Sequence, residues 1–392
     1  MSSKKLWFVN RVMSVLPTPS LDDARLLEAA AKLEGKTDFG DGRFEAGLAV
    51  LTRSLERDAK LSPMGREAVY RMIVRNLCMR LRLVADQRRR PEIYAKPLTP
   101  PILVLGLPRA GTTFLHRLLS AMPGARPGRT WEVNQPLAPS EGKDDRYRQA
   151  AKQVAMIRKL APDLDAKHRL DPDEPEECVF LLNPSFCSIA WWMIAPVYSY
   201  LDWYGEQDLG PAYREYHAYL RALQAAEPGR LVLKAPAHTG HLAQIISEIP
   251  DVVVVYAHRD PVTVVASVSS LFNSVFGLVT EHHDVQRTAR RNLDLFISMT
   301  DRCQAARDQG LDDRVLDIHY DDLVADPIAT ARRIYAHGSI PWPDDGEQAL
   351  RAHMQGGRRS RPKHVYSLED CGLTEAEVRG RFAPYAARYL SR

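Results

Sequence analysis

The segment from Pro101 to Leu119 constrains the fold more than any other part of this sequence. It begins with the apolar run Ile-Leu-Val-Leu, passes through a turn that contains Gly106, Pro108 and Gly111, and ends with apolar residues at helical spacing. This order predicts a buried strand, a tight loop and a helix. Amides of such a loop can turn inward on an anion, and the positive end of the helix adds to the field. The segment therefore predicts a phosphate-binding loop.

The spacing Gly106-x4-Gly111 fits a Walker A loop, but one residue differs. Where a nucleoside-triphosphatase has its lysine, this chain has Thr112, and the cation of the loop is Arg109. Because the Walker lysine reaches the β- and γ-phosphates beside Mg²⁺, a loop without it is poorly suited to triphosphate chemistry. A strand-to-helix turn whose glycines serve packing alone is the structural alternative.

A second strand, helix, strand pattern lies further along the chain. Residues 230–234 and 251–258 are runs of Val and Leu without alternation, which is typical of parallel strands buried on both faces. Residues 240–249 would form the right-handed crossover between them. Arg259 then follows the second strand, and Ser267 falls inside the next helix. An Arg and a Ser in these places can converge on one phosphate.

These two motifs together resemble those of the sulfotransferase family. Pro108-Arg-Ala-Gly-Thr-Thr113 is similar to the family's 5′-phosphosulfate loop, and Arg259-(x)7-Ser267 is similar to its 3′-phosphate site, in the same order. The resemblance covers residues 99–392 and is closest to the bacterial-type members. It implies an α/β enzyme with a three-layer, P-loop-like fold around a central parallel sheet. Such an enzyme transfers a sulfuryl group from 3′-phosphoadenosine 5′-phosphosulfate (PAPS) to a hydroxyl, and needs no metal.

The resemblance also implies roles for individual residues. Arg109 would bind the donor and neutralise the leaving phosphate oxygen, and Arg259 with Ser267 would bind the 3′-phosphate. The 5′-phosphate would be held by the amides and hydroxyls of four loop residues, Ala110, Gly111, Thr112 and Thr113.

A basic C-terminal loop often closes over the 3′-phosphate in this family. The cation-rich tail at residues 356–364 contains Arg358 and Arg361, which could take that role. A solvated basic loop is the competing interpretation, and the Arg-Lys-Gly-x-x-Gly motif of the cytosolic vertebrate branch is absent.

Sulfuryl transfer to a hydroxyl needs a base for the acceptor proton, and the resemblance offers two candidates. Glu132 follows the first helix, where several bacterial and tyrosylprotein sulfotransferases have a catalytic Glu, although its spacing from Arg109 is slightly longer. His238 follows the strand where cytosolic sulfotransferases have their catalytic His, although it falls slightly later in the motif. A His suits base work near neutrality, whereas a Glu would need its pKa raised by burial. Each residue also has a structural alternative, and Lys234 could touch the transferring group.

The first 98 residues have a different pattern from the rest. Helix signals near residues 21–33 and after Ser62-Pro63 predict an N-terminal helical region at 1–98, with the α/β domain at 99–392. The helix that starts at Pro63 has apolar residues on one side and arginines on the other. Packing on the catalytic domain is the favoured interpretation, and docking on a membrane or a lipid-like acceptor is the alternative.

Composition excludes several other classes of protein. With 45% apolar residues and a formal charge of only +4 over 392 residues, the chain can fill a large core, and its charge does not predict nucleic-acid binding. Its five scattered cysteines, without a CxxC or a His cluster, favour reduced thiols, no metal site and a cytoplasmic location. We find no stretch that approaches 18 uncharged apolar residues, and therefore expect no transmembrane segment.

The acceptor is less clear from the sequence. An aromatic run from Trp191 to Tyr204 would line a pocket for an apolar or ring-bearing acceptor, or fill the core. A small molecule, a glycan and a lipid all stay open, as does a homodimer. Two other functions remain as alternatives: a P-loop kinase with an atypical phosphate loop, against which Thr112 speaks, and a nucleotide-binding module that has lost catalysis.

Overall fold

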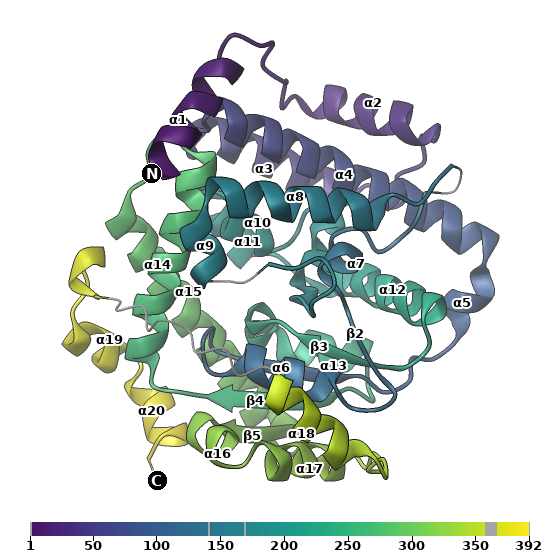
Figure 1. Cartoon of the computed structure of the whole chain (residues 1–392), viewed down its shortest axis with the longest axis vertical. Helices are drawn as coiled ribbons and strands as arrows, with labels where there is room; N and C mark the ends of the chain where they lie inside the picture. The colour runs from purple at the N-terminus through teal and green to yellow at the C-terminus, as the bar shows by residue number, and fades with distance from the viewer. Residues whose placement is uncertain (1, 140–141, 168–169, 357–366, 392) are drawn as a thin grey trace.

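One parallel sheet organises the molecule (Figure 1). The computed structural model describes residues 2–139, 142–167, 170–356 and 367–391. Within these, five strands are hydrogen-bonded in the order β2-β3-β1-β4-β5, and every neighbouring pair is parallel. The strands are β1 Ile102–Gly106, β2 Ala125–Pro127, β3 Arg230–Lys234, β4 Val253–His258 and β5 Val315–His319. The predicted α/β class and the parallel sheet are confirmed.

Helices cover both faces of this sheet. Helices α6 and α17 contact the strands directly, as do α12 and α16, and further helices pack on these. The helices after β1 are α6 Thr112–Ser120, α7 Thr130–Asn134, α8 Arg146–Leu160, α9 Pro162–Lys167, α10 Ala190–Ile194, α11 Tyr198–Gly205, α12 Gly210–Ala226, α13 Leu242–Glu248, α14 Pro261–Val279, α15 Val285–Ala306, α16 Tyr320–Ala325, α17 Pro327–His337, α18 Gly346–Gly356, α19 Glu375–Arg381 and α20 Ala383–Tyr389. Short turns of other helical types are η1 Cys178–Ser185, η2 Pro236–His241, η3 Arg307–Leu311, η4 Asp312–Arg314 and η5 Glu369–Cys371. Helix α13 forms the predicted crossover from β3 to β4.

The central strand shows why the strands lack polar alternation. All five residues of β1 are buried. Ile102 and Val104 belong to the apolar cluster shared with α6 and α17, whereas Leu103 and Leu105 belong to the large cluster on the opposite face. Because successive side chains of a strand point to opposite faces, each strand must be apolar throughout when helices cover both.

Five helices precede the sheet: α1 Ser2–Met13, α2 Asp23–Glu34, α3 Phe44–Arg57, α4 Pro63–Arg89 and α5 Pro91–Ala95. Ser62 caps α4 as predicted, since its hydroxyl accepts a hydrogen bond from the amide of Gly65. A Cβ on Gly65 would lie 1.8 Å from the carbonyl oxygen of Val279 in α14. The backbone of α4 is therefore in direct contact with the backbone of the predicted α/β domain. The large apolar cluster accordingly contains residues from both predicted regions, among them Leu77 and Tyr256.

Helix α14 corrects one expectation from the sequence. It runs for 19 residues at a mean hydropathy of 1.8 and is, among the described residues, the one helix long and apolar enough to cross a membrane. The expectation that no stretch approaches 18 uncharged apolar residues is therefore wrong here. Half of this window is buried inside the molecule, and its Phe272 and Phe276 pack against Trp192 at ring-centroid distances of 6.4 and 5.6 Å.

Candidate active site

The predicted phosphate loop joins β1 to α6, and its backbone requires glycine at two places. Gly106 has a φ of +130°, and a Cβ there would lie 2.4 Å from the carbonyl oxygen of Ala257 on β4. Gly111, at the start of α6, has a φ of +87°. Residues with a side chain rarely adopt such φ angles. The conformation of the turn therefore requires glycine at both positions. Arg109, between them, has a backbone in the left-handed region, with a φ of +68°. Strained backbone conformations of this kind are common at ligand-binding sites.

The amino-terminal end of α6 is free to bind an anion. Its N-cap, Gly111, provides no side-chain hydrogen bond, and the first intrahelical bond in the turn runs from Leu115 to the carbonyl of Gly111. The amides before Leu115, including those of Thr112 and Thr113, therefore lack intrahelical acceptors and point at the loop. The amide of Ala110 differs, since it donates to the carbonyl of Leu107 at 3.2 Å.

The two predicted phosphate motifs meet at this loop. Arg259 follows β4, and its Nη1 donates to the carbonyl oxygen of Arg109 at 2.8 Å. Its guanidinium also lies 4.0 Å from the ring centroid of Tyr320, which begins α16. The neighbouring Asp260 pairs with Arg379 of α19 at 3.1 Å rather than with Arg259. The Arg109 side chain is exposed, and among the described residues its guanidinium has no hydrogen bond or ion pair.

A cavity of about 500 Å³ opens beside Arg259 at the carboxyl ends of β4 and β5. Its lining includes Arg259, Tyr320, His319 and Arg379. Ser267 is buried on α14, inside the helix that starts from the same strand end, as predicted. The structure therefore brings the loop, Arg259 and this cavity to one edge of the sheet, where α/β proteins bind their ligands.

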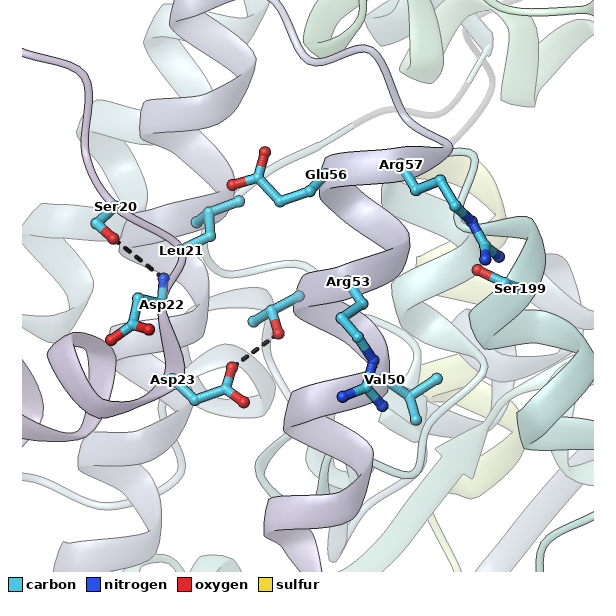
Figure 2. Close-up of a pocket in the computed structure, with 10 residues that line it drawn as sticks. Ser20, Leu21, Asp22, Asp23, Val50, Arg53, Glu56, Arg57 and Ser199 are labelled. Carbon is cyan, nitrogen blue, oxygen red and sulfur yellow. Dashed lines mark hydrogen bonds between the residues drawn. The ribbon is translucent and has the colours of Figure 1, made fainter.

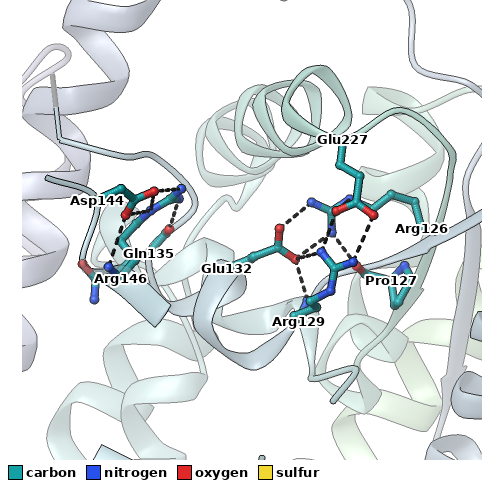
Figure 3. Close-up of polar contacts among 8 residues, drawn as sticks. All are labelled: Arg126, Pro127, Arg129, Glu132, Gln135, Asp144, Arg146 and Glu227. Carbon is teal, nitrogen blue, oxygen red and sulfur yellow. Dashed lines mark hydrogen bonds and ion pairs between the residues drawn. The ribbon is translucent and has the colours of Figure 1, made fainter. Parts of the chain in front are cut away.

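Glu132 is part of a buried ion-pair network (Figure 3). This side chain on α7 is 5% exposed, and Arg126 of β2 binds both its oxygens, at 2.6 and 2.7 Å. The amide of Arg129 donates to Oε2 at 3.0 Å, which completes a capping box for α7. Arg129 in turn pairs with Glu227 at 2.6 Å. Each oxygen of this candidate base is therefore already bound to a donor.

His238 lies in the core rather than at an open site. It is fully buried in η2; its Nδ1 is 2.8 Å from the Tyr213 hydroxyl and its Nε2 is 3.3 Å from Sγ of Cys178. Burial, and secondarily the charge of His241, lowers the pKa of His238 to about 3. The structure thus places both ring nitrogens in polar contacts and keeps the ring neutral over the physiological range.

The sequence did not single out Glu177 as a functional residue, and it lies beside the predicted Lys234. Lys234 ends β3, next to β1, and its side chain is 2% exposed. Its Nζ donates to Oε1 of Glu177 at 2.7 Å. The Glu177 side chain is 17% exposed, and among the described residues its Oε2 has no partner. The acidic run Asp171–Glu177 was the sequence feature that could have drawn attention to Glu177. Nothing in that run indicates that Glu177 binds a lysine 57 residues later.

The remaining predicted site features fall elsewhere. Arg358 and Arg361 lie outside the described residues. Of the aromatic run, Trp191, Trp192 and Tyr200 are fully or almost fully buried, so these members fill the core. Across the described residues, no group of three or more His, Cys, Asp or Glu side chains could hold a metal ion.

A second cavity of about 690 Å³ lies away from the sheet, between α2, α3 and α11 (Figure 2). Its lining is charged, but several of its polar groups are already paired. Asp23 accepts a hydrogen bond from Thr52 at 2.7 Å, and Glu56 pairs with Arg66. We assign no ligand to it.

A family model described as "Sulfotransferase family" matches residues 100–344. The chain belongs to the sulfotransferase family. The matched range contains β1 to β5, the phosphate loop and Arg259, so the family assignment and the site geometry rest on the same residues. The predicted resemblance, and with it an enzyme of the sulfotransferase class, is confirmed.

Named relatives and solved structures agree with this assignment. The sulfotransferase is 24% identical over 275 residues to ω-hydroxy-β-dihydromenaquinone-9 sulfotransferase Stf3 of Mycobacterium bovis and Mycobacterium tuberculosis, a match that covers 67% of this chain and 68% of the relative. Sulfotransferase STF1 of M. tuberculosis H37Rv superposes with a TM-score of 0.80 at 30% identity, over 93% of this chain and 98% of that one. STF9 of Mycobacterium avium gives 0.84 at 26% identity, over 94% and 96%.

Proposed function

We propose that this sulfotransferase moves a sulfuryl group from PAPS to a hydroxyl on a lipid-like acceptor. The donor is supported by the hydrogen bond from Arg259 to the backbone carbonyl of Arg109, which joins the two predicted phosphate motifs. The acceptor class is supported by the relative Stf3, whose name gives a hydroxylated menaquinone derivative. Small-molecule and glycan hydroxyls are the competing acceptor classes.

The chain's own residues fit a 3′,5′-bisphosphorylated nucleotide. The free amides at the start of α6, with the hydroxyls of Thr112 and Thr113, would hold the 5′-phosphate. Arg259 and Ser267 would hold the 3′-phosphate, with Arg358 and Arg361 as further candidates. PAPS supplies the activated sulfuryl group. The exposed guanidinium of Arg109 would neutralise charge on the phosphate oxygen that leaves.

For the base we propose Glu177 in place of Glu132 and His238. A base needs a lone pair that a substrate hydroxyl can reach, and Oε2 of Glu177 has one, whereas the oxygens of Glu132 are bound to Arg126 and Arg129. Glu177 would accept the proton of the acceptor hydroxyl while the acceptor oxygen attacks the sulfur of PAPS. The bond from that sulfur to the 5′-phosphate oxygen would break, and adenosine 3′,5′-bisphosphate would leave. Lys234, held by Oε1 of the same carboxylate, would place positive charge next to that position.

Calorimetric titration with adenosine 3′,5′-bisphosphate, beside AMP and ATP with Mg²⁺, tests the donor site. We expect the bisphosphate to bind much more tightly than AMP. Preference for ATP with Mg²⁺ would support the kinase alternative. Turnover is then measured with PAPS and a panel of hydroxylated isoprenoids, sugars and small phenols, and the isoprenoids should react fastest. Tight bisphosphate binding without turnover on any of them would favour the inactive module.

The base is tested by Glu177→Gln, with Glu132→Gln and His238→Phe as matched variants. Loss of a general base lowers the rate by roughly 10²- to 10⁴-fold, and we expect this drop in kcat for Glu177→Gln with unchanged bisphosphate affinity. The other two variants should affect folding more than kcat. Full activity in Glu177→Gln would remove the assignment.

The compartment is also a proposal. All five cysteines are free thiols, and burial raises the pKa of Cys78, Cys178, Cys187 and Cys303 to about 12, so these thiols stay protonated and unreactive. A chain that keeps five unpaired cysteines suits a reducing, cytoplasmic environment. Finding disulfides in the protein isolated from its own cells would contradict this.

A further inference from the structure

Exposed apolar side chains are concentrated on one part of the surface. Ten large apolar residues are exposed among the described residues, and five of them lie within residues 7–16, on α1 and the turn after it. Trp7 and Phe8 are each 63% exposed. Two more, Tyr147 and Met156, lie on α8. Five exposed large apolar residues within ten positions are a local concentration of the kind that marks an interaction site, whereas scattered single residues do not.

The same two helices carry an uneven charge. Helices α1 and α8 together have eight basic residues, namely Lys4, Lys5, Arg11, Arg146, Arg148, Lys152, Arg158 and Lys159, and no Asp or Glu. The whole chain, by contrast, has 53 basic and 49 acidic residues. Arg146, Arg148 and Arg158 pair with acidic neighbours, but Lys152 and Lys159 are exposed and have no ion pair among the described residues.

The two helices form one face. Helix α1 packs on α4 and touches α8 (Figure 1). Asn10 fixes α1 there, because its Oδ1 accepts a hydrogen bond from the amide of Met64 at 2.9 Å. Helix α8 packs on α7, which carries Glu132, and Arg146 donates to the carbonyl of Gln135 at 2.8 Å, as Figure 3 shows. Helices α1 and α8 therefore lie side by side, and α8 is anchored on the helix that carries the buried Glu132 network.

We propose that α1 and α8 dock this protein on an anionic lipid bilayer. An interfacial helix buries aromatic and aliphatic side chains at the boundary of headgroups and acyl chains, while Lys and Arg contact anionic headgroups. Trp7 and Phe8 would enter the interface, and Lys152 and Lys159 would add contacts with the headgroups. The charge argues for a bilayer and against a second copy, since two such faces would bring like charges together.

This docking goes beyond the transfer reaction and does not depend on the acceptor. Because binding to vesicles is measured without PAPS or turnover, its failure would leave the proposed sulfuryl transfer untouched. Equally, if no sulfuryl transfer were found, the proposal that α1 and α8 bind a bilayer would be unaffected.

Cosedimentation of the full chain with vesicles tests the proposal. Vesicles of phosphatidylcholine alone are compared with vesicles of equal parts phosphatidylcholine and phosphatidylglycerol, at low and high salt. We expect binding to the anionic vesicles, weakened by salt. The variants W7S/F8S and K152E/K159E should each bind at least about tenfold more weakly. Leu33→Ser and Lys32→Glu, exposed positions on α2, are the matched controls and should bind as the wild type does.

Trp7 provides a second readout that does not depend on how well a variant folds. Its emission should shift to shorter wavelength on anionic vesicles, and Trp7→Phe should lose this shift while keeping the binding. Equal binding to neutral and anionic vesicles, or no binding to either, would overturn the proposal. A dimer in sedimentation velocity that W7S/F8S converts to a monomer, without vesicle binding, would assign the face to a second copy instead.

Discussion

Two arginine clusters at the sheet differ in what surrounds them. At the predicted phosphate loop, Arg109 is exposed, and within the described part of the chain the Arg259 guanidinium contacts a backbone carbonyl and the Tyr320 ring. At α7, Arg126 is buried and binds both oxygens of Glu132. Among the residues that the structure describes, the first cluster has positive charge with no carboxylate partner, whereas the charge of Arg126 in the second is neutralised by Glu132. A cation left without a counter-charge indicates where an anionic ligand binds, and a satisfied pair indicates where the chain is held together.

The largest effect should come from breaking the satisfied pair. Glu132→Gln leaves the Arg126 guanidinium buried without its counter-charge, and removal of one partner of a buried pair costs about 3–5 kcal/mol. We expect a loss of this size in the free energy of unfolding, measured in urea. The double variant R126M/E132L should recover much of it, because apolar replacements remove both charges at once. Wild-type stability in Glu132→Gln would mean that the network contributes nothing.

Removing the unpaired cation should act on binding instead. Arg259→Ala should weaken binding of adenosine 3′,5′-bisphosphate by about 2–3 kcal/mol, the value of a lost charged hydrogen-bond partner. Calorimetry measures this, and AMP, which has no 3′-phosphate, is the control ligand. Arg259→Lys should restore part of the affinity. If AMP and the bisphosphate weakened equally, Arg259 would be shaping the loop through Arg109 rather than binding the 3′-phosphate.

The buried histidine should appear in the pH dependence of stability. Because the folded-state pKa of His238 is lowered to about 3 from 6.5, the unfolded chain takes up a proton below pH 6.5 that the folded chain cannot. Stability is therefore complete above pH 6.5 and falls as the pH drops toward 3, by up to about 1.4 kcal/mol per pH unit for this residue. His238→Phe should flatten the measured slope by that amount. An unchanged slope would show that the ring is accessible to protons.

The smallest effect concerns the ring beneath Arg259. Tyr320→Leu removes a cation–π contact worth about 0.5–1 kcal/mol at such a site. Bisphosphate affinity should fall by a few fold while the free energy of unfolding stays within that range. Tyr320→Phe keeps the ring and should behave as the wild type. A loss as large as that of Arg259→Ala would mean that the ring contacts the nucleotide directly.

Features that depend on local backbone conformation were predictable from the sequence. The tight turn between β1 and α6 follows from Gly106 and Gly111, whose φ values residues with side chains rarely adopt. The strands follow from apolar runs, which a sheet covered on both faces requires. The start of α4 followed from Ser62 and its hydrogen bond to Gly65. Helix α14 was underestimated because Ser and Thr interrupt its apolar residues, although none of its 19 residues is charged.

Features that depend on distant partners were not predictable. Nothing around His238 in the sequence indicates Tyr213 or Cys178, which surround it in the fold. The partner of Lys234, Glu177, comes from a segment that precedes α10 to α12 and β3. A polar residue near a motif can equally be a base or a buried structural group, and its exposure, which the sequence does not contain, separates the two.

The beginning of the phosphate loop is held by one hydroxyl. Thr239, next to the buried His238 in η2, accepts a hydrogen bond from the amide of Gly106 at 3.1 Å and lies 3.3 Å from its carbonyl oxygen. The backbone at Gly106 is therefore fixed when the chain folds. An anion that binds at the predicted loop would then not bear the cost of ordering this residue, and less of its binding free energy would be lost on association.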